Sequence, residues 1–130
     1  MLAKDIYHET VKQALIKDGM DTLATYRQII KSVLTEYARI PYAYGDIQTE
    51  TIFAPDGDHY LLVNVGWEND RRVHGCLVHI DLINGKVWIQ RDGTEDGIAN
   101  DLVAAGIPKA QIVLGFQTAD VRPHTEFAVS

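Results

Sequence analysis

A chain of 130 residues, 46% of them hydrophobic, is long enough to form one domain with a hydrophobic core of its own. Its formal net charge of −6 leaves no excess of basic side chains to neutralise phosphates, which disfavours tight, unaided DNA binding. No apolar run approaches the length of a membrane span, and Cys76 is the only cysteine, so we expect a cytoplasmic protein without an internal disulfide.

Two helices are predicted at the start of the chain. Residues 4–17 form an amphipathic pattern that stops at Asp18-Gly19. A second helical pattern follows at once and ends before Pro41. Its apolar residues recur at spacings of three and four: Leu23, Tyr26, Ile29, Ile30, Val33, Leu34 and Tyr37.

From Gly45 onwards the hydrophobic pattern has a period of two, which indicates strands. Short polar turns separate the strands, so they predict an antiparallel meander of about four strands. Their expected bounds are Asp46–Ala54, His59–Trp67, Arg72–Ile83 and Lys86–Gln90. Alternation in the second strand predicts that one set of side chains shares the core face with Val78 and Ile80, namely Leu61, Val63, Val65 and Trp67.

Asn84-Gly85 is a strong hairpin signal between the third and fourth strands, because both residues tolerate positive φ. A two-residue turn sets the register, which pairs Asp81 with Trp88 and Ile80 with Ile89. One face of this hairpin is then apolar and carries Val78, Ile80, Leu82, Val87 and Ile89. The other face is polar and carries His79, Asp81, Trp88 and Gln90.

A further helix is predicted after the fourth strand, with a buried stripe of Ile98, Ala99, Leu102, Val103 and Ala105. Asp92 or Thr94 is expected to cap its start, with Glu95 and Asp96 in its positively polarised first turn. Its end is marked by a left-handed Gly106, by Ile107 closing back on the helix, and by Pro108. Residues 111–116 then form a short strand-like run, which completes an expected α+β fold with helices covering one face of the sheet.

The polar hairpin face is the main candidate site. Its residues, His79, Asp81, Trp88 and Gln90, are compatible with a solvated sheet face, a surface for a protein partner, or catalysis. A tryptophan among polar residues is typical of protein interfaces, so we treat these residues as a candidate partner surface. A small hydrolase or nuclease using His79 and Asp81 is the catalytic alternative.

Metal and cofactor signals are weak. His74, Cys76 and His79 resemble metal ligands, but strand alternation predicts that His79 points away from the other two. The acidic residues Asp92, Glu95 and Asp96 are explained by helix capping. No nucleotide-binding or nucleophile motif occurs, so we predict no enzyme, no cofactor and no metal. A direct DNA-binding role would use the basic residues Arg71, Arg72, Lys86 and Arg91.

Several segments together resemble one protein family. They are MDTLATYRQIIKSVLTEYA, DHYLLVNVGW, RRVHGCLVHIDLINGKVWIQRDGTEDGIANDL, GIPKAQIVLGF, and the closing Arg122 to Ala128. In this order, over residues 20–130, they resemble the XisI family. Its members are named as excision controlling factors of the fdxN element, which is removed in cyanobacterial heterocyst differentiation. The resemblance implies an α+β XisI-like domain. It also implies an accessory role in DNA rearrangement beside an excision recombinase and an XisH-like partner, and it supplies no catalytic residues.

Residues 1–19 depart from that pattern, because AKDIYHETVKQALIKDG resembles the opening of XisH. We therefore expect an XisH-like N-terminal extension at residues 1–19 and an XisI-like domain at residues 20–130. An added amphipathic helix needs an apolar surface to lie on, so self-association into a homo-oligomer is a further expectation.

Overall fold

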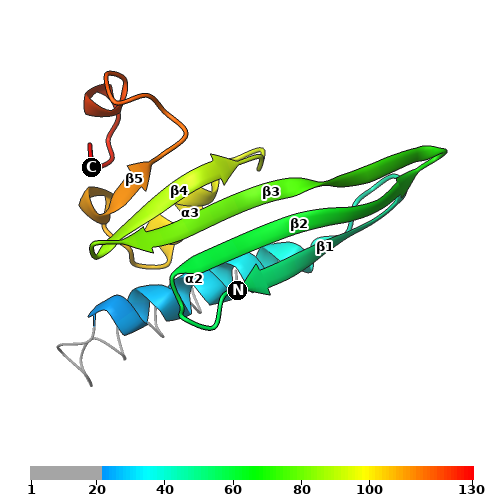
Figure 1. Ribbon diagram of the computed structural model, residues 1–130, viewed down its shortest axis with the longest axis horizontal. Helices are drawn as coiled ribbons and strands as arrows, with labels where there is room; N and C mark the ends of the chain where they lie inside the picture. Colours follow the sequence, from blue (N-terminus) through cyan, green and yellow to red (C-terminus); the bar gives the residue numbers. More distant parts are fainter. Residues whose placement is uncertain (1–21) are drawn as a thin grey trace.

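The computed structural model describes residues 22–130, and the helix expected at residues 4–17 lies outside them. The described part is an α+β fold in which α2 precedes a five-stranded sheet, and α3 lies between β4 and β5 (Figure 1). The bounds are α2 Thr22–Ala38, β1 Asp46–Phe53, β2 His59–Glu68, β3 Arg71–Ile83, β4 Lys86–Asp92, α3 Ile98–Ala104 and β5 Ile112–Leu114. Two short 3-10 turns lie at Lys109–Gln111 and Arg122–His124. No helix within residues 22–130 is long and apolar enough to cross a membrane.

The sheet has the order β1-β2-β3-β4-β5, and its first four strands form the expected antiparallel meander. The last strand, β5, instead pairs parallel to β4, so the sheet is mixed. A parallel neighbour needs a crossover connection, and α3 provides it here. The sequence signals for β5 were short and gave no direction, so only the structure shows this pairing.

One face of the sheet is covered by α2 and α3, which lie behind it in Figure 1. The predicted apolar stripe of α2 is buried, with Ile30 and Leu34 fully inaccessible to solvent. From the sheet, the core receives Tyr60, Leu62, Val78, Ile80, Leu82, Val87 and Ile89. The helix-covered face of the β3–β4 hairpin is therefore the apolar face that the sequence indicated.

The β3–β4 turn confirms the predicted register. Asn84 and Gly85 have φ values of 50° and 78°, the left-handed conformation that this two-residue turn requires. Asp81 pairs with Trp88 and Ile80 pairs with Ile89, as expected. A register shift between His79 and Ile80 then makes Gln90 an extra residue in β4, and His79 faces Arg91.

The predicted core face of β2 was wrong. Tyr60 and Leu62 are fully buried, whereas the four residues expected in the core lie on the opposite side: Leu61, Val63, Val65 and Trp67. The cause is a β-bulge in β3, because Leu62 faces Val78 while Val63 faces Cys76, which leaves Leu77 as an extra residue. One inserted residue reverses the side-chain alternation for all that follows it.

The start of α3 also differs from the prediction. The helix begins at Ile98, so Glu95 and Asp96 precede it and do not lie in its first turn. The N-cap residue is Gly97, not Asp92 or Thr94, and it has no capping side chain. Asp92 still satisfies the first helical N–H, since its Oδ2 accepts the Ile98 N–H at 2.7 Å. The same side chain accepts the Thr94 N–H through Oδ1 at 2.9 Å, which folds residues 92–97 into a turn before the helix.

The end of α3 is as predicted. Gly106 has a φ of 119°, and its N–H donates to the Val103 carbonyl. The Ile107 N–H donates to the Leu102 carbonyl, and Ile107 is buried against the core. These two bonds form a Schellman motif, in which a glycine ends the helix and the next apolar residue closes on it.

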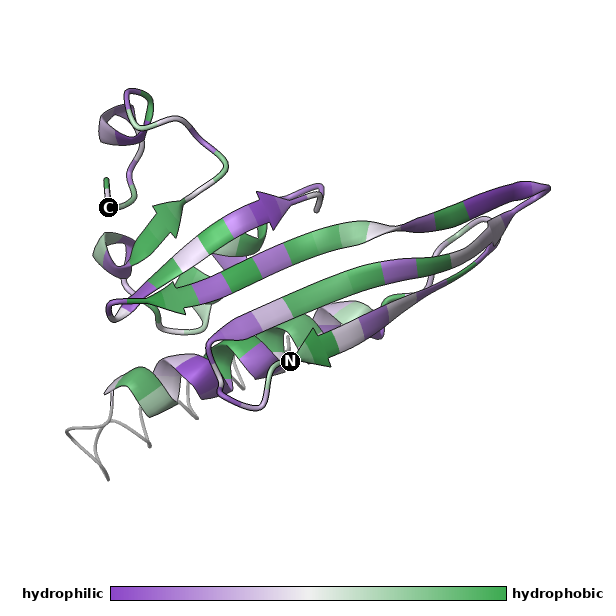
Figure 2. Cartoon of the chain, viewed as in Figure 1, coloured by the Kyte–Doolittle hydropathy of each residue, from purple (hydrophilic) through white to green (hydrophobic). Residues whose placement is uncertain are grey.

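The face of the sheet opposite the helices is here called the open face, and it carries His59, Leu61 and Val63 of β2 and His79 and Asp81 of β3. Figure 2 shows hydrophobic residues running along β2, with a hydrophilic tip where β2 turns into β3. Since Tyr60 and Leu62 point into the core, the apolar residues of β2 lie on both faces of the sheet. A strand with this composition is typical of a sheet that is covered on both sides.

Candidate functional site on the open face

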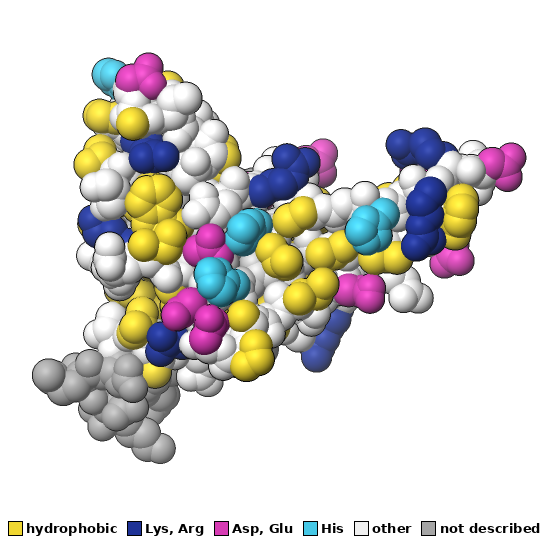
Figure 3. All heavy atoms as spheres, viewed as in Figure 1, with side chains coloured by type: hydrophobic (Ala, Val, Ile, Leu, Met, Phe, Trp, Pro, Cys, Tyr) yellow, Lys and Arg dark blue, Asp and Glu magenta, His cyan; other side chains and the backbone are white. Residues whose placement is uncertain are grey.

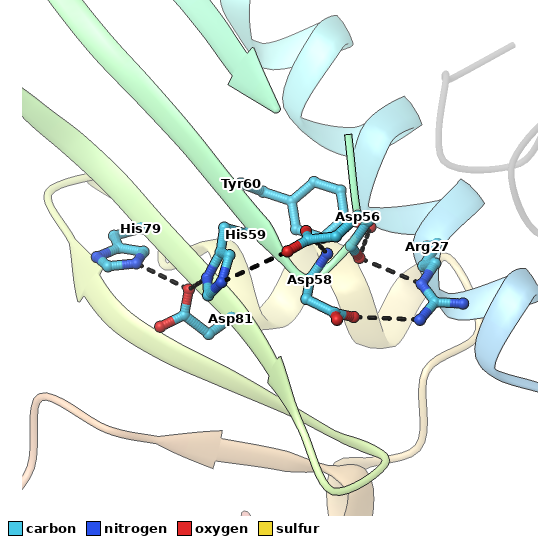
Figure 4. Close-up of polar contacts among 8 residues, drawn as sticks. Arg27, Asp56, Asp58, His59, Tyr60, His79 and Asp81 are labelled. Carbon is cyan, nitrogen blue, oxygen red and sulfur yellow. Dashed lines mark hydrogen bonds and ion pairs between the residues drawn. The ribbon is translucent and has the colours of Figure 1, made fainter. Parts of the chain in front are cut away.

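The centre of the open face is a cluster of His59, His79 and Asp81 (Figure 4). His59 is the first residue of β2 and lies directly opposite Asp81 of β3, while His79 is two residues before Asp81 on the same strand. Asp81 Oδ1 is 2.7 Å from His59 Nδ1 and 2.9 Å from His79 Nε2. Two imidazole rings from neighbouring strands thus converge on one carboxylate oxygen.

The other oxygen of Asp81 is held by β4. Gln90 Nε2 donates to Asp81 Oδ2 at 3.3 Å, and the extra position of Gln90 in β4 brings its amide to this side of the sheet. The Asp81 side chain is 13% exposed, whereas those of His59 and His79 are 57% and 37% exposed. The carboxylate is therefore the fixed centre of the cluster, and the imidazoles form its accessible rim.

The charge state of the cluster follows from these contacts. Burial alone would raise the pKa of Asp81, but the hydrogen bonds from His59, His79 and Gln90 outweigh it, and the pKa is lowered. The hydrogen bond to Asp81 raises the pKa of His59, with smaller contributions from the nearby carboxylates of Asp56 and Asp58. Asp81 is consequently an anion at neutral pH that faces two nitrogen donors.

The turn before His59 is anchored to α2 (Figure 4). Arg27 donates from Nε to the Gly57 carbonyl at 3.2 Å, and its guanidinium lies 3.1 Å from Asp58 Oδ1. The buried Tyr60 hydroxyl donates to the same Gly57 carbonyl at 2.5 Å. These contacts fix the turn between β1 and β2, and so they position the first residue of β2 opposite Asp81.

Trp88 lies on the open face opposite Asp81, but the C-terminal segment covers it in part. The Arg122 guanidinium carbon lies 5.1 Å from the centre of the Trp88 ring, a cation–π distance. Gly115 comes so close that an added Cβ would lie 3.2 Å from the Trp88 ring and 2.6 Å from Gln90 Oε1. The predicted set His79, Asp81, Trp88 and Gln90 therefore lies on one face, but Trp88 is not a free aromatic side chain.

An apolar stripe continues from the cluster along β2. Leu61, Val63 and Val65 are partly exposed, and the stripe ends at Trp67, which is 49% exposed and stacks with Arg72. Ile52 of β1 pairs with Leu61 and is 50% exposed, which widens the stripe. Figure 3 shows histidine, acidic and hydrophobic side chains interspersed over this face. The open face thus combines a charged cluster with an apolar strip, a composition suited to protein contact.

The basic residues named as DNA contacts do not form one patch. Arg71 and Arg72 lie at the β2–β3 tip, where Arg71 contacts Glu68 at 3.2 Å. Lys86 lies beside the β3–β4 turn, roughly 35 Å along β3 from Arg72 at about 3.3 Å per residue, and it contacts the Ser130 carbonyl. Arg91 donates from Nε to the Cys76 carbonyl at 2.8 Å.

The bulge in β3 also changes the placement of His74 and Cys76. They pair with Val65 and Val63, so they lie on the open face together with His79, not on the opposite side as alternation predicted. Within residues 22–130, the group whose ligand atoms come within 4.8 Å of one another is nevertheless His59, His79 and Asp81. This is a donor set of two imidazoles and one carboxylate, which is able to hold a divalent metal ion.

His59 is the member of the cluster that the sequence did not point to. An unbroken ladder from the tip, where Glu68 faces Arg71, would pair His59 with Ile80 and would place His59 toward the core. The bulge moves its partner by one residue, to Asp81. The sequence signal was a histidine at the start of one strand and a histidine–aspartate pair, His79 and Asp81, on the next strand. That signal indicates a cluster only once the register of the two strands is known.

The comparisons with known proteins agree with this architecture. The XisI family model, described as XisI protein, matches residues 20–129. A crystal structure of a XisI-like protein from Anabaena variabilis ATCC 29413 is 34% identical, with a TM-score of 0.76, over 84% of this chain and 100% of its own. That of the fdxN element excision controlling factor XisI from the same organism is 32% identical, with a TM-score of 0.71, over 85% of this chain and 100% of its own. Among curated proteins no significant match was found. The chain belongs to the XisI family.

Proposed function

We propose that this chain is a controlling factor of DNA-element excision that acts by protein contact through its open face. Membership of the XisI family supports the excision role, as does the similarity to a protein named as the fdxN element excision controlling factor. The role requires no catalytic step by the chain itself. The open face, with its apolar stripe next to the His59–His79–Asp81 cluster, is the observation that supports contact with a protein.

The apolar stripe is the strongest part of this support. Leu61, Val63 and Val65 are side chains of the kind found inside a sheet covered on both faces, and here the two helices cover only the other face. Ile52 and Trp67 are each about half exposed at its margin. A protein that docks on this face would remove the stripe from water, which gives a hydrophobic driving force for binding.

The charge distribution favours a protein partner over DNA. The formal net charge is −6, and the arginines at the β2–β3 tip are accompanied by acidic neighbours, Glu68 and Asp70. Arg72 stacks on Trp67. Contacts to phosphate would have to displace these interactions, and the counterion release that drives DNA binding needs an excess of cations.

A hydrolytic role for His79 and Asp81 has less support. Both histidines are directed at the same oxygen of Asp81, and the cluster lies on a sheet face with its imidazoles exposed. A cavity beside the C-terminal end of α2 is lined by other residues, among them Tyr37, Tyr42 and Leu77. A general base acts on a substrate held next to it, which a pocket usually provides.

The partners proposed from the family resemblance are an XisH-like protein and the excision recombinase. An XisH-like partner is the first to test, because residues 1–19 resemble the opening of XisH and the family match begins at residue 20. We further propose that residues 1–19 are an extension that the XisI-like domain does not need for folding. A chain beginning at Met20 should then unfold cooperatively, with the circular dichroism of the full chain; a Met20 chain without cooperative unfolding would refute this.

The test of the partner surface is a Val63→Lys substitution, which puts a charge in the middle of the stripe. Ile40→Lys is the matched control, because Ile40 is 59% exposed in the loop after α2, away from the open face. Binding to the purified XisH-like protein is measured by calorimetry, and excision is measured with a reporter element in cells. Ile40 is exposed and Val63 is only partly exposed, so folding is checked by circular dichroism before either assay.

We expect Val63→Lys to abolish binding and excision, and Ile40→Lys to leave both intact. Wild-type binding and excision by Val63→Lys would refute the open face as the partner surface. Sedimentation of the chain alone shows whether the surface instead joins two copies, because Val63→Lys would then convert a dimer to a monomer. A mobility shift with duplex DNA that is lost in Arg71→Ala/Arg72→Ala would favour direct DNA binding.

A further inference from the structure

We propose that His59, His79 and Asp81 form a binding site for a divalent transition-metal ion, with Zn²⁺ as the ion of best fit. The three ligand atoms lie within 4.8 Å of one another and come from two adjacent strands. Two imidazole nitrogens and one carboxylate oxygen are ligands that Zn²⁺ commonly takes in proteins. The site does not depend on the proposed function.

The geometry of the cluster is close to that of a bound metal. Zinc ligands lie about 2.0–2.2 Å from the ion at tetrahedral angles, so neighbouring ligand atoms are roughly 3.4 Å apart. The distances from Asp81 Oδ1 to His59 Nδ1 and His79 Nε2 are 2.7 and 2.9 Å. These two gaps would widen by roughly 0.5 to 0.7 Å on metal binding, a change within reach of small side-chain rotations.

The two imidazoles also distinguish this cluster from a simple ion pair. One histidine is enough to neutralise one carboxylate, yet two direct a ring nitrogen at the same oxygen of Asp81. A metal ion placed between the three groups would accept a lone pair from each of them. Each neutral ring would then carry its proton on the nitrogen that does not bind the metal.

The surroundings of Asp81 match the second shell of a metal site. Gln90 Nε2 donates to Asp81 Oδ2, which orients the carboxylate and leaves Oδ1 directed at the histidines. Such outer contacts fix ligand geometry before the metal arrives. His59 and His79 are 57% and 37% exposed, so an ion can enter from the open face, and water can fill its fourth coordination position.

The β-bulge at Leu77 is the reason that the site exists. The bulge places His59, and not Asp58, opposite Asp81, while His79 lies on the same face. The buried pairs Tyr60–Ile80 and Leu62–Val78 hold β2 and β3 in this register. The ligands therefore project from a rigid sheet and not from loops, which favours a preformed site.

The proposal is tested with the full chain, stripped of metal by EDTA and titrated with ZnCl₂ in a calorimeter. We expect one Zn²⁺ per chain in the wild type, and affinity lower by at least about tenfold in His79→Gln and in Asp81→Asn. His74→Gln is the matched control, since His74 lies exposed on the same strand and face, and it should bind as the wild type does.

Nuclear magnetic resonance of the histidine side chains locates the ion even if a variant folds poorly. Zn²⁺ should shift the ring nitrogens of His59 and His79 in the wild type and leave those of His74 and His124 unchanged. The site would be overturned by the absence of Zn²⁺ binding in the wild type, by equal losses in His74→Gln and His79→Gln, or by imidazole shifts confined to other histidines. Loss of binding in Cys76→Ser alone would place the ion at the thiol and would also overturn it.

Discussion

Arg122, from the C-terminal segment, lies over the ring of Trp88 on β4, with 5.1 Å between the guanidinium carbon and the ring centre. Arg122 also donates from Nε to the Gln117 carbonyl at 3.1 Å, within the C-terminal segment. Its contact with Trp88 therefore joins that segment to the sheet. The sequence places Trp88 on the open face through the hairpin register. Arg122, which covers it, is more than thirty residues away in the chain, and only the tertiary fold brings the two side chains together.

Replacing Arg122 with Ala should expose the Trp88 ring and move its fluorescence emission to longer wavelength. The reason is that the guanidinium shields one face of the indole from water. The measurement is made in a Trp67→Phe background, because Trp67 is the other tryptophan of the chain. An unchanged emission maximum would show that Arg122 does not cover the ring in solution.

Replacing Asp81 with Asn should lower the free energy of unfolding by about 1 kcal/mol in metal-free buffer. The charge that attracts both imidazoles is lost, while the amide keeps the size of the carboxylate. Urea denaturation provides the measurement, and Glu50→Gln is the control, because Glu50 is an exposed carboxylate on the same face. Equal effects of the two substitutions would mean that the histidine contacts add nothing to stability.

Replacing Gly66 with Ala should disrupt the pairing of β1 with β2. A Cβ at this position would lie 2.0 Å from the Asp46 carbonyl oxygen, a backbone atom that moves only if the strands separate. We expect a loss of at least about 3 kcal/mol, in the range of severe packing defects. Gly75→Ala is the comparison, since nothing lies within 4 Å of its added Cβ, and thermal unfolding of the two variants should differ widely.

Tyr60 should make the stability of the protein fall at alkaline pH. Burial raises the pKa of Tyr60 to about 12 from an ordinary value of 10.0. Between these values the unfolded chain has released the phenolic proton and the native chain still holds it, so the free energy of unfolding decreases as pH rises. The contribution is fully present below pH 10 and is lost as pH rises through about 12.

The effect of Tyr60 is isolated by comparing the denaturation of the wild type and of Tyr60→Phe between pH 10 and 12. Burial also raises the pKa values of Tyr26 and Tyr37, but these two residues are common to both proteins. The stability advantage of the wild type over Tyr60→Phe should be constant below pH 10 and shrink above it. A difference that stays constant up to pH 12 would mean that the hydroxyl is not buried in solution.

Local chemistry was enough to predict several elements of this fold. The Asn84-Gly85 turn, the end of α3 at Gly106, and the apolar stripe of α2 all depend on residues within one or two turns of one another. Their physical causes are backbone conformation and short-range periodicity, which a sequence displays directly. The register of the β3–β4 hairpin follows from its turn, and so the core face of that hairpin was also predictable.

The side of β2 that faces the core was decided by a single inserted residue. Leu77 is the extra residue of the bulge in β3. Both Leu77 and Val78 pack against the core, and the Leu77 carbonyl accepts the Gly93 N–H. Nothing local to residues 76–78 marks this bulge. Three outcomes follow from it: the reversed core face of β2, the shared face of His74, Cys76 and His79, and the His59–Asp81 contact.

By itself the sequence determined the family, the order of the elements and the composition of each face of the β3–β4 hairpin. What the tertiary structure decided is which residues meet across the sheet, including the cluster at Asp81 and the cover over Trp88. The physical reason is that turns and helix ends are satisfied by neighbouring residues. The pairing of distant strands depends instead on how the whole core packs, and one bulge there changes every contact beyond it.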